Sequence, residues 1–165
     1  MKKMLSIILA LVLCLSAVSA IAEAVPSITT ADLIDVEEQV EGLELSLPED
    51  QAAADGQLAV LADAASVEEY FGDESVANAT VDEFFAIEVE EVPETEELIP
   101  VSFKASKEYN DGDEVIVMIG IVNGENVEWT AFDGVAEGNK ITIEVEPEFL
   151  NSLKDATVLV AILSK

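Results

Sequence analysis

The chain has 165 residues, of which 35 are Asp or Glu and 7 are Lys, with no Arg and no His, so its formal net charge is −28. The absence of His excludes Ser-His-Asp and Cys-His nucleophiles, His-ligated zinc and an imidazole general base. The single Cys permits no internal disulfide, and the shortage of basic residues argues against nucleic-acid binding, whose affinity comes mostly from neutralised phosphates.

Residues 1–24 are predicted to be a cleaved secretory signal peptide. Met1-Lys2-Lys3 is a short basic start, residues 5–15 are uncharged and apolar, and small residues allow cleavage after Ala20 or Ala24. A retained anchor is the alternative, because residues 5–22 together have about the minimum length of a membrane span. Cys14 lies inside this stretch and follows Leu13, which excludes a lipid-attachment box, so the mature protein is expected to contain no Cys.

The basic start and the apolar run of this leader resemble the signal peptides of Gram-positive, clostridial-type bacteria. The chain as a whole resembles small secreted proteins of such bacteria. This resemblance implies export, and we expect a secreted, extracellular protein with no membrane association after signal cleavage.

Charge divides the rest of the chain into two parts. Residues 25–97 hold 22 acidic and no basic residues, whereas residues 98–165 hold 12 acidic residues and 5 Lys. We therefore predict a weakly ordered acidic arm or linker over residues 25–55 and a β-rich globular domain over residues 56–165. Within the arm, Leu33, Val36, Val40 and Leu43 recur at helical spacing, but acidic residues at the same spacing repel one another. A mobile arm and a docked element both remain open, with residues 48–56 as a hinge.

The first local structure of the predicted domain lies between residues 57 and 72. Residues 57–62 form a short apolar run. Ser66 and Glu69 match a capping box, which predicts a short helix through Phe71 that ends at Gly72.

The remaining residues predict strands. Apolar residues alternate with polar ones over 85–89, 99–103, 127–131 and 141–145, and residues 115–122 are apolar on both faces, as expected for a central strand. Asn123-Gly124 predicts a hairpin and Gly138-Asn139 a further turn. Residues 147–153 fit one or two helical turns, and residues 157–163 fit a last buried strand.

This pattern predicts a mainly β protein with a single β-sandwich and one or two short helices. The strand that contains Trp129, the polar-faced strand after it, the helical corner and the buried last strand resemble an immunoglobulin-like sandwich. The chain departs from that pattern because it lacks disulfide cysteines and a clear final strand. Residues 57–62, or another strand, would have to complete the sheets.

Oxygen ligands are the main functional groups available. Asp111, Asp113 and Glu114 cluster in a turn, which makes them a calcium candidate, although they lack the spacing of an EF-hand and a plain turn is the alternative. No catalytic residue and no other cofactor is predicted, because no acidic pair lies in the apolar surroundings that raise a catalytic pKa. Trp129 is a possible sugar platform, but its alternation with apolar neighbours favours a core position.

The sequence therefore predicts a secreted bacterial binding or interaction module that acts by surface recognition and performs no catalysis. Its negative charge would select cationic or calcium-bridged partners, either an extracellular protein or a component of the cell envelope. The alternatives are a small carboxylate-dependent extracellular hydrolase and a calcium-stabilised structural protein.

Overall fold

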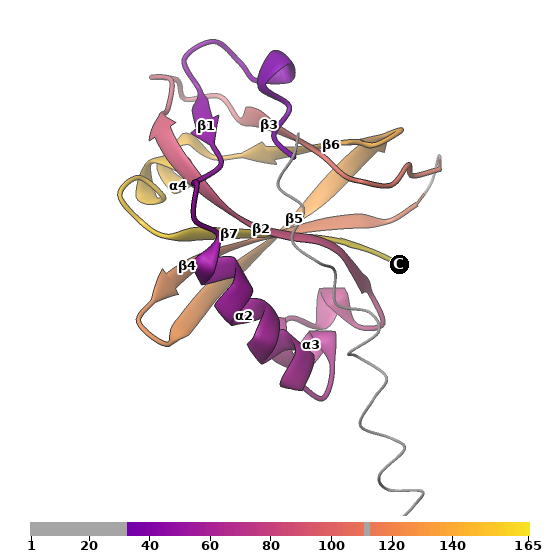
Figure 1. Cartoon of the computed structure of the whole chain (residues 1–165). Helices are drawn as coiled ribbons and strands as arrows, with labels where there is room; N and C mark the ends of the chain where they lie inside the picture. The colour runs from indigo at the N-terminus through magenta and orange to yellow at the C-terminus, as the bar shows by residue number, and fades with distance from the viewer. Residues whose placement is uncertain (1–32, 111–112) are drawn as a thin grey trace, which may run out of the picture.

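The fold is mainly β, as predicted. The computed structural model describes residues 33–110 and 113–165, and their seven strands form one antiparallel sheet in the order β1-β2-β7-β4-β5-β6-β3 (Figure 1). The strands are β1 (Glu44–Ser46), β2 (Thr80–Glu91), β3 (Ile99–Lys104), β4 (Val115–Asn123), β5 (Asn126–Glu137), β6 (Lys140–Val145) and β7 (Val158–Ser164).

The two strands with continuous apolar sequences lie at the centre of the sheet. β7 pairs with β2 on one side and β4 on the other. Val160 of β7 packs into a first core on one face of the sheet, and its neighbour Leu159 packs into a second core on the opposite face. The prediction of buried strands covered on both faces is therefore confirmed for β4 and β7.

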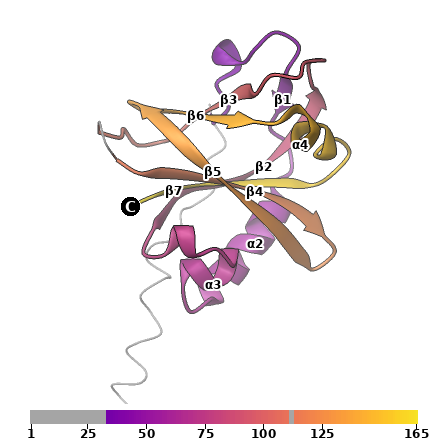
Figure 2. The same cartoon turned by 180° about the vertical axis from the view of Figure 1, so that it is seen from behind.

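Strand β5 allows the sheet to curl. Its first part pairs with β4, whereas residues 135–137 pair with β6, so β6 and β3 lie across the first core from β2, β7 and β4 (Figure 2). Gly134 stands where the pairing changes, and a Cβ atom there would lie 2.9 Å from Cγ2 of Ile141. A glycine at this point lets the two layers approach closely.

Two helices cover the second core on the opposite face of the sheet. These are α2 (Ala52–Asp63) and α3 (Val67–Phe71). The predicted cap of α3 is confirmed: Oγ of Ser66 accepts a hydrogen bond from the Glu69 amide at 3.1 Å, and Gly72 ends the helix with φ +67°. Two 3-10 turns, η1 (Val36–Glu38) and η2 (Glu74–Val76), complete this half of the chain.

Helix α2 differs from the sequence prediction. Residues 57–62 do not complete the sheet, and the expected hinge at 48–56 contains the start of this helix. The reason is that Ala54, Leu58 and Leu61 share one buried helix face. The side chain of Gln51 also fixes the helix start to β2, since its Oε1 accepts a hydrogen bond from the Ala86 amide at 2.7 Å.

Residues 33–46, which we call the N-terminal segment, are docked on the sheet rather than detached from it. Ile34 forms an antiparallel bridge with Phe103 of β3, while β1 pairs with β2, so the segment contacts both edge regions of the curled sheet. Leu33 and Leu43 are buried, and Glu37 and Glu41 are exposed. The exposed Glu37 and Glu41 are solvated, and the buried carboxylate of Asp35 lies 3.2 Å from Nζ of Lys104. Apolar burial together with this ion pair explains why charge repulsion does not detach the segment. The predicted signal peptide and residues 25–32 lie outside the described residues.

The C-terminal helix lies where residues 147–153 predicted helical turns. It is α4 (Pro147–Ser152), with Pro147 at its start. Among the helices of residues 33–110 and 113–165, none is long and apolar enough to span a membrane.

Candidate functional site

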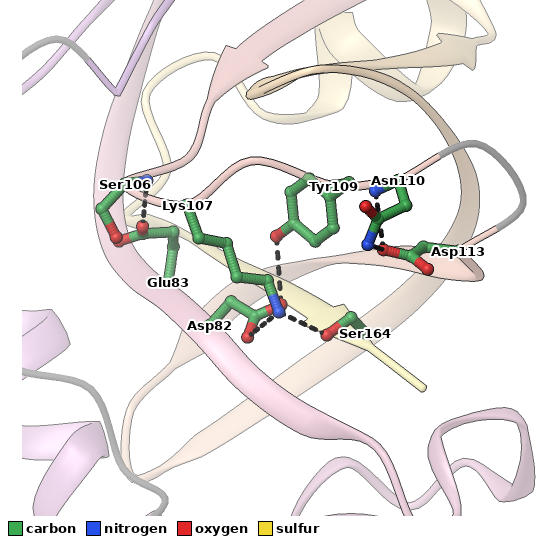
Figure 3. A network of polar contacts seen from close by, with 8 residues as sticks. All are labelled: Asp82, Glu83, Ser106, Lys107, Tyr109, Asn110, Asp113 and Ser164. Atoms are coloured by element: carbon green, nitrogen blue, oxygen red, sulfur yellow. Dashed lines mark hydrogen bonds and ion pairs between the residues drawn. The ribbon is translucent and has the colours of Figure 1, made fainter.

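The predicted calcium ligands are only partly within the described residues, because Asp111 lies outside them. Oδ2 of Asp113 accepts hydrogen bonds from the backbone amide and the side-chain Nδ2 of Asn110, at 2.8 and 3.4 Å (Figure 3). Oε2 of Glu114 lies 3.8 Å from Nζ of Lys165. No cluster of three or more metal-ligating side chains occurs in the described part of the chain. Within the described residues, the carboxylate of Asp113 accepts hydrogen bonds inside the turn and so helps to hold its shape. Calcium binding by the whole turn stays a prediction.

A cluster of polar contacts lies beside this turn, at a bulge in β2. Val81 pairs with Leu163 and Glu83 pairs with Ile162, so the register of the pairing skips Asp82. Figure 3 shows the carboxylates of both Asp82 and Glu83 directed at the loop that follows β3. Oε1 of Glu83, a residue only 3% exposed, accepts a hydrogen bond from the Ser106 amide at 2.5 Å. The backbone amide of Ser106 thereby gives this buried carboxylate a hydrogen-bond donor.

Asp82 holds the same loop through two side chains. Its carboxylate accepts hydrogen bonds from Nζ of Lys107 at 2.7 Å and from the hydroxyl of Tyr109 at 3.0 Å. Nζ of Lys107 also lies 2.8 Å from Oγ of Ser164. This arrangement is suited to holding the loop and the end of β7 against β2.

Of the two tyrosines of the chain, Tyr109 is buried and Tyr70 is half-buried, and burial raises the pKa of each phenol above its ordinary value of 10.0. The negative charge of Asp82 and the hydrogen bond to it raise the pKa of Tyr109 further. Since tyrosine is neutral when protonated, the folded protein keeps these protons above about pH 10, whereas the unfolded chain releases them.

Alkaline titration is therefore expected to show no phenolate absorbance in the folded protein near pH 10. The free energy of unfolding should fall as pH rises above that value, and phenolate should appear together with the loss of circular dichroism. Tyr70→Phe and Tyr109→Phe should each remove about half of the final absorbance change, because the chain has two tyrosines. Phenolate absorbance that develops near pH 10 without unfolding would contradict the buried environments.

A groove lies between the two helices and the hairpin that joins β4 to β5. It has a volume of about 440 Å³, and we call it the hairpin groove. Its lining includes two half-buried aromatic rings, Tyr70 of α3 and Trp129 of β5. The hairpin and the helices that form it lie together on the lower side of the molecule in Figure 1.

Trp129 has its position because it faces a glycine. Gly120 of β4 is its partner in the strand register, and a Cβ at Gly120 would lie 2.6 Å from Cε3 of Trp129 and 2.6 Å from Cγ1 of Val127. The missing side chain leaves space for the indole ring to lie across β4, as aromatic residues opposite strand glycines do.

Other aromatic rings surround the indole. The centroid of the Phe71 ring lies 4.8 Å away at an interplanar angle of 73°, and those of Tyr70 and Phe84 lie 5.9 Å away. The predicted core-facing alternation of Trp129 with Val127 and Ala131 is confirmed, because all three pack against the second core. Trp129 nevertheless also lines the groove.

Tyr70 is held by one contact to α2 and one within its own helix. Its hydroxyl donates a hydrogen bond to Oε1 of Gln57 on α2 at 3.1 Å, and its ring packs edge-on against Phe71 with centroids 4.8 Å apart. The side chains that line the groove are thus set by packing and hydrogen bonds, which lowers the entropy cost of ordering them on binding.

The polar side chains that line the groove give it a negative charge. Three exposed carboxylates belong to Asp63 at the end of α2, Glu69 of α3 and Glu125 of the hairpin turn. None of the described residues that line it is basic. The groove therefore combines aromatic surface with an electrostatic potential that attracts cations.

Sequence reasoning identified Trp129 but not the groove around it. Tyr70 and Glu125 are recognisable as groove residues only once the hairpin is placed against α3. Comparison with protein families, curated proteins and solved structures found no match to this chain.

Proposed function

We propose that this protein is a secreted bacterial binding module that recognises an extracellular partner through its surface and performs no catalysis. The observation that carries the proposal is the hairpin groove, with its two aromatic rings and three exposed carboxylates. Such a groove offers contact area and charge, whereas the buried carboxylate of Glu83 and its neighbour Asp82 are engaged in holding a loop.

The proposed location is supported by the leader. Residues 1–24 have the basic start, apolar run and small-residue cleavage frames of a signal peptide. An acidic surface favours solubility outside the cell, where the mature chain would carry no thiol to oxidise.

The proposed fold class is a β-sandwich. The layer of β3 and β6 packs across the first core from β2, β7 and β4, which supports this class. An immunoglobulin-like relationship stays a prediction. In this view the curled sheet is a rigid frame that presents the hairpin and the two helices.

Capture by the secreted protein tests the proposal. The full chain is produced with its own leader, and we expect to recover it from the medium with a first residue of Ile21 or Val25. Immobilised, it should retain a partner from spent medium or cell envelopes, and Trp129→Ala should lose that partner. Equal capture by a Trp129→Ala protein that is shown to be folded by circular dichroism would overturn the groove as the binding surface. A chain that stays with the membranes at full length would overturn secretion.

A further inference from the structure

We propose that the hairpin groove binds an arginine side chain of a partner polypeptide. This inference rests on the proposed function, because it names the chemistry that a binding module with this groove would recognise. The groove would accept the cationic end of the side chain between its rings and its carboxylates.

The two aromatic rings of the groove offer a surface that attracts cations. The ring centroids of Trp129 and Tyr70 are 5.9 Å apart with an interplanar angle of 55°, and both rings line the same groove. Cations bind aromatic rings at up to about 6 Å from the centroid, most favourably for tryptophan, and a guanidinium can also stack on the ring. Because both rings line the groove, a cationic group that enters it can contact aromatic surface.

The carboxylates around the groove also attract cations. Asp63, Glu69 and Glu125 come from three different elements and are all exposed, so they are free to turn toward a bound cation. An anionic ligand would be repelled, and a neutral sugar would gain nothing from the charge. The net charge of −28 also steers polycations toward the protein over longer distances.

Size favours a side chain on a polypeptide over a small free cation. A volume of about 440 Å³ far exceeds the size of an ammonium group, so this open groove has room for more than the charged end of a side chain. The remaining space can take the aliphatic stem of the side chain and the neighbouring peptide. The exposed Val60, which is 53% exposed, lines the groove and offers an apolar contact for that stem.

The experiment uses Trp129 as its own reporter, because it is the only tryptophan of the chain. Tryptophan fluorescence of the mature protein is followed while acetyl-Gly-Gly-Arg-Gly-Gly-amide is added, and in parallel the same peptide with citrulline, which is a neutral analogue of arginine. We expect a saturable change with the arginine peptide and binding about tenfold weaker or more with the citrulline peptide.

A matched pair of charge variants tests whether the arginine peptide binds in the hairpin groove. Glu125→Gln should weaken binding of the arginine peptide by about two- to fivefold. Glu144→Gln makes the same change of charge at an exposed position of β6, outside the groove, and should leave binding unchanged. Both residues are exposed, so neither substitution is expected to disturb folding.

Three results would overturn the inference. These are equal binding of the arginine and citrulline peptides, equal weakening by Glu125→Gln and Glu144→Gln, and saturable binding of cellohexaose in place of the arginine peptide. The last result would reassign the groove to carbohydrates. If partner capture depends on Trp129 while the arginine peptide fails to bind, the binding module stands and only the cationic ligand is rejected.

Discussion

Replacing Phe103 with alanine is expected to lower the free energy of unfolding by about 3–5 kcal/mol. Phe103 is 0% exposed, and its ring lies edge-on to Phe85 across the first core with centroids 5.9 Å apart. The same residue forms the bridge to Ile34 and thereby helps to hold the N-terminal segment. The truncation therefore leaves a cavity at the point where the two layers and the segment meet. Urea denaturation followed by circular dichroism measures the change.

Leu98→Ala is the control for that substitution. Leu98 directly precedes β3 but is 51% exposed, so its removal should change the free energy of unfolding by no more than about 0.5 kcal/mol. A loss below about 1 kcal/mol for Phe103→Ala would mean that β3 does not close over β2 as described.

Gly120→Val is expected to destabilise the protein by about 1–3 kcal/mol and to disturb the environment of Trp129. A Cβ at this position would already come within 2.6 Å of both the indole ring and Val127, and the two extra methyl groups of valine add to the overlap. The indole must then move away from β4. We expect a shift of the tryptophan emission to longer wavelength together with the lower midpoint of urea denaturation.

Gly56→Ala provides the matched glycine control. Gly56 is exposed within α2, and a Cβ there would meet nothing within 4 Å. Alanine is the better helix former, so this variant should be more stable by about 0.5–1 kcal/mol, with unchanged tryptophan emission. Unchanged emission and stability in Gly120→Val would contradict the position of Trp129 over β4.

The strands could be predicted from the sequence because their burial follows a local period. Ile141 and Ile143 face the first core and Thr142 does not, which is the alternation that the sequence shows. The hairpin was also predictable from local sequence, because Asn123-Gly124 is typical of a tight turn between two strands. Gly124 directly follows β4 and has the positive φ, 67°, that such a turn requires. Residues 115–122 were recognisable as a central strand because both of their faces are apolar.

The helix α2 was not predicted, and docking of the N-terminal segment was only one of two alternatives that the sequence left open, because both depend on surfaces formed elsewhere. The signal for the helix was present in the spacing of Ala54, Leu58 and Leu61, but it is weak because small alanines also lie on the exposed side. Leu33 and Leu43 are buried only because the curled sheet offers them two edge regions. No pattern within the segment itself reports that surface.

The groove could not be predicted because it forms only when strand pairing and helix packing bring distant parts of the chain together. Trp129 lies over Gly120 because of the β4–β5 pairing, and it meets Tyr70 because α3 packs on the second core. The acidic residues of the groove are ordinary solvated carboxylates in the sequence. Only their placement around the two rings distinguishes them from the other acids of the chain.

Chemical-shift mapping tests the central claim most directly. Nitrogen-15-labelled mature protein is titrated with the arginine peptide, and the indole Nε1–H signal of Trp129 is followed with the backbone amides. We predict that this signal shifts together with the amides of α3 and of the hairpin around Glu125, and that the amides of β3 and β6 stay in place. Shifts confined to β3 and β6, with an unmoved indole signal, would contradict the hairpin groove as the binding site.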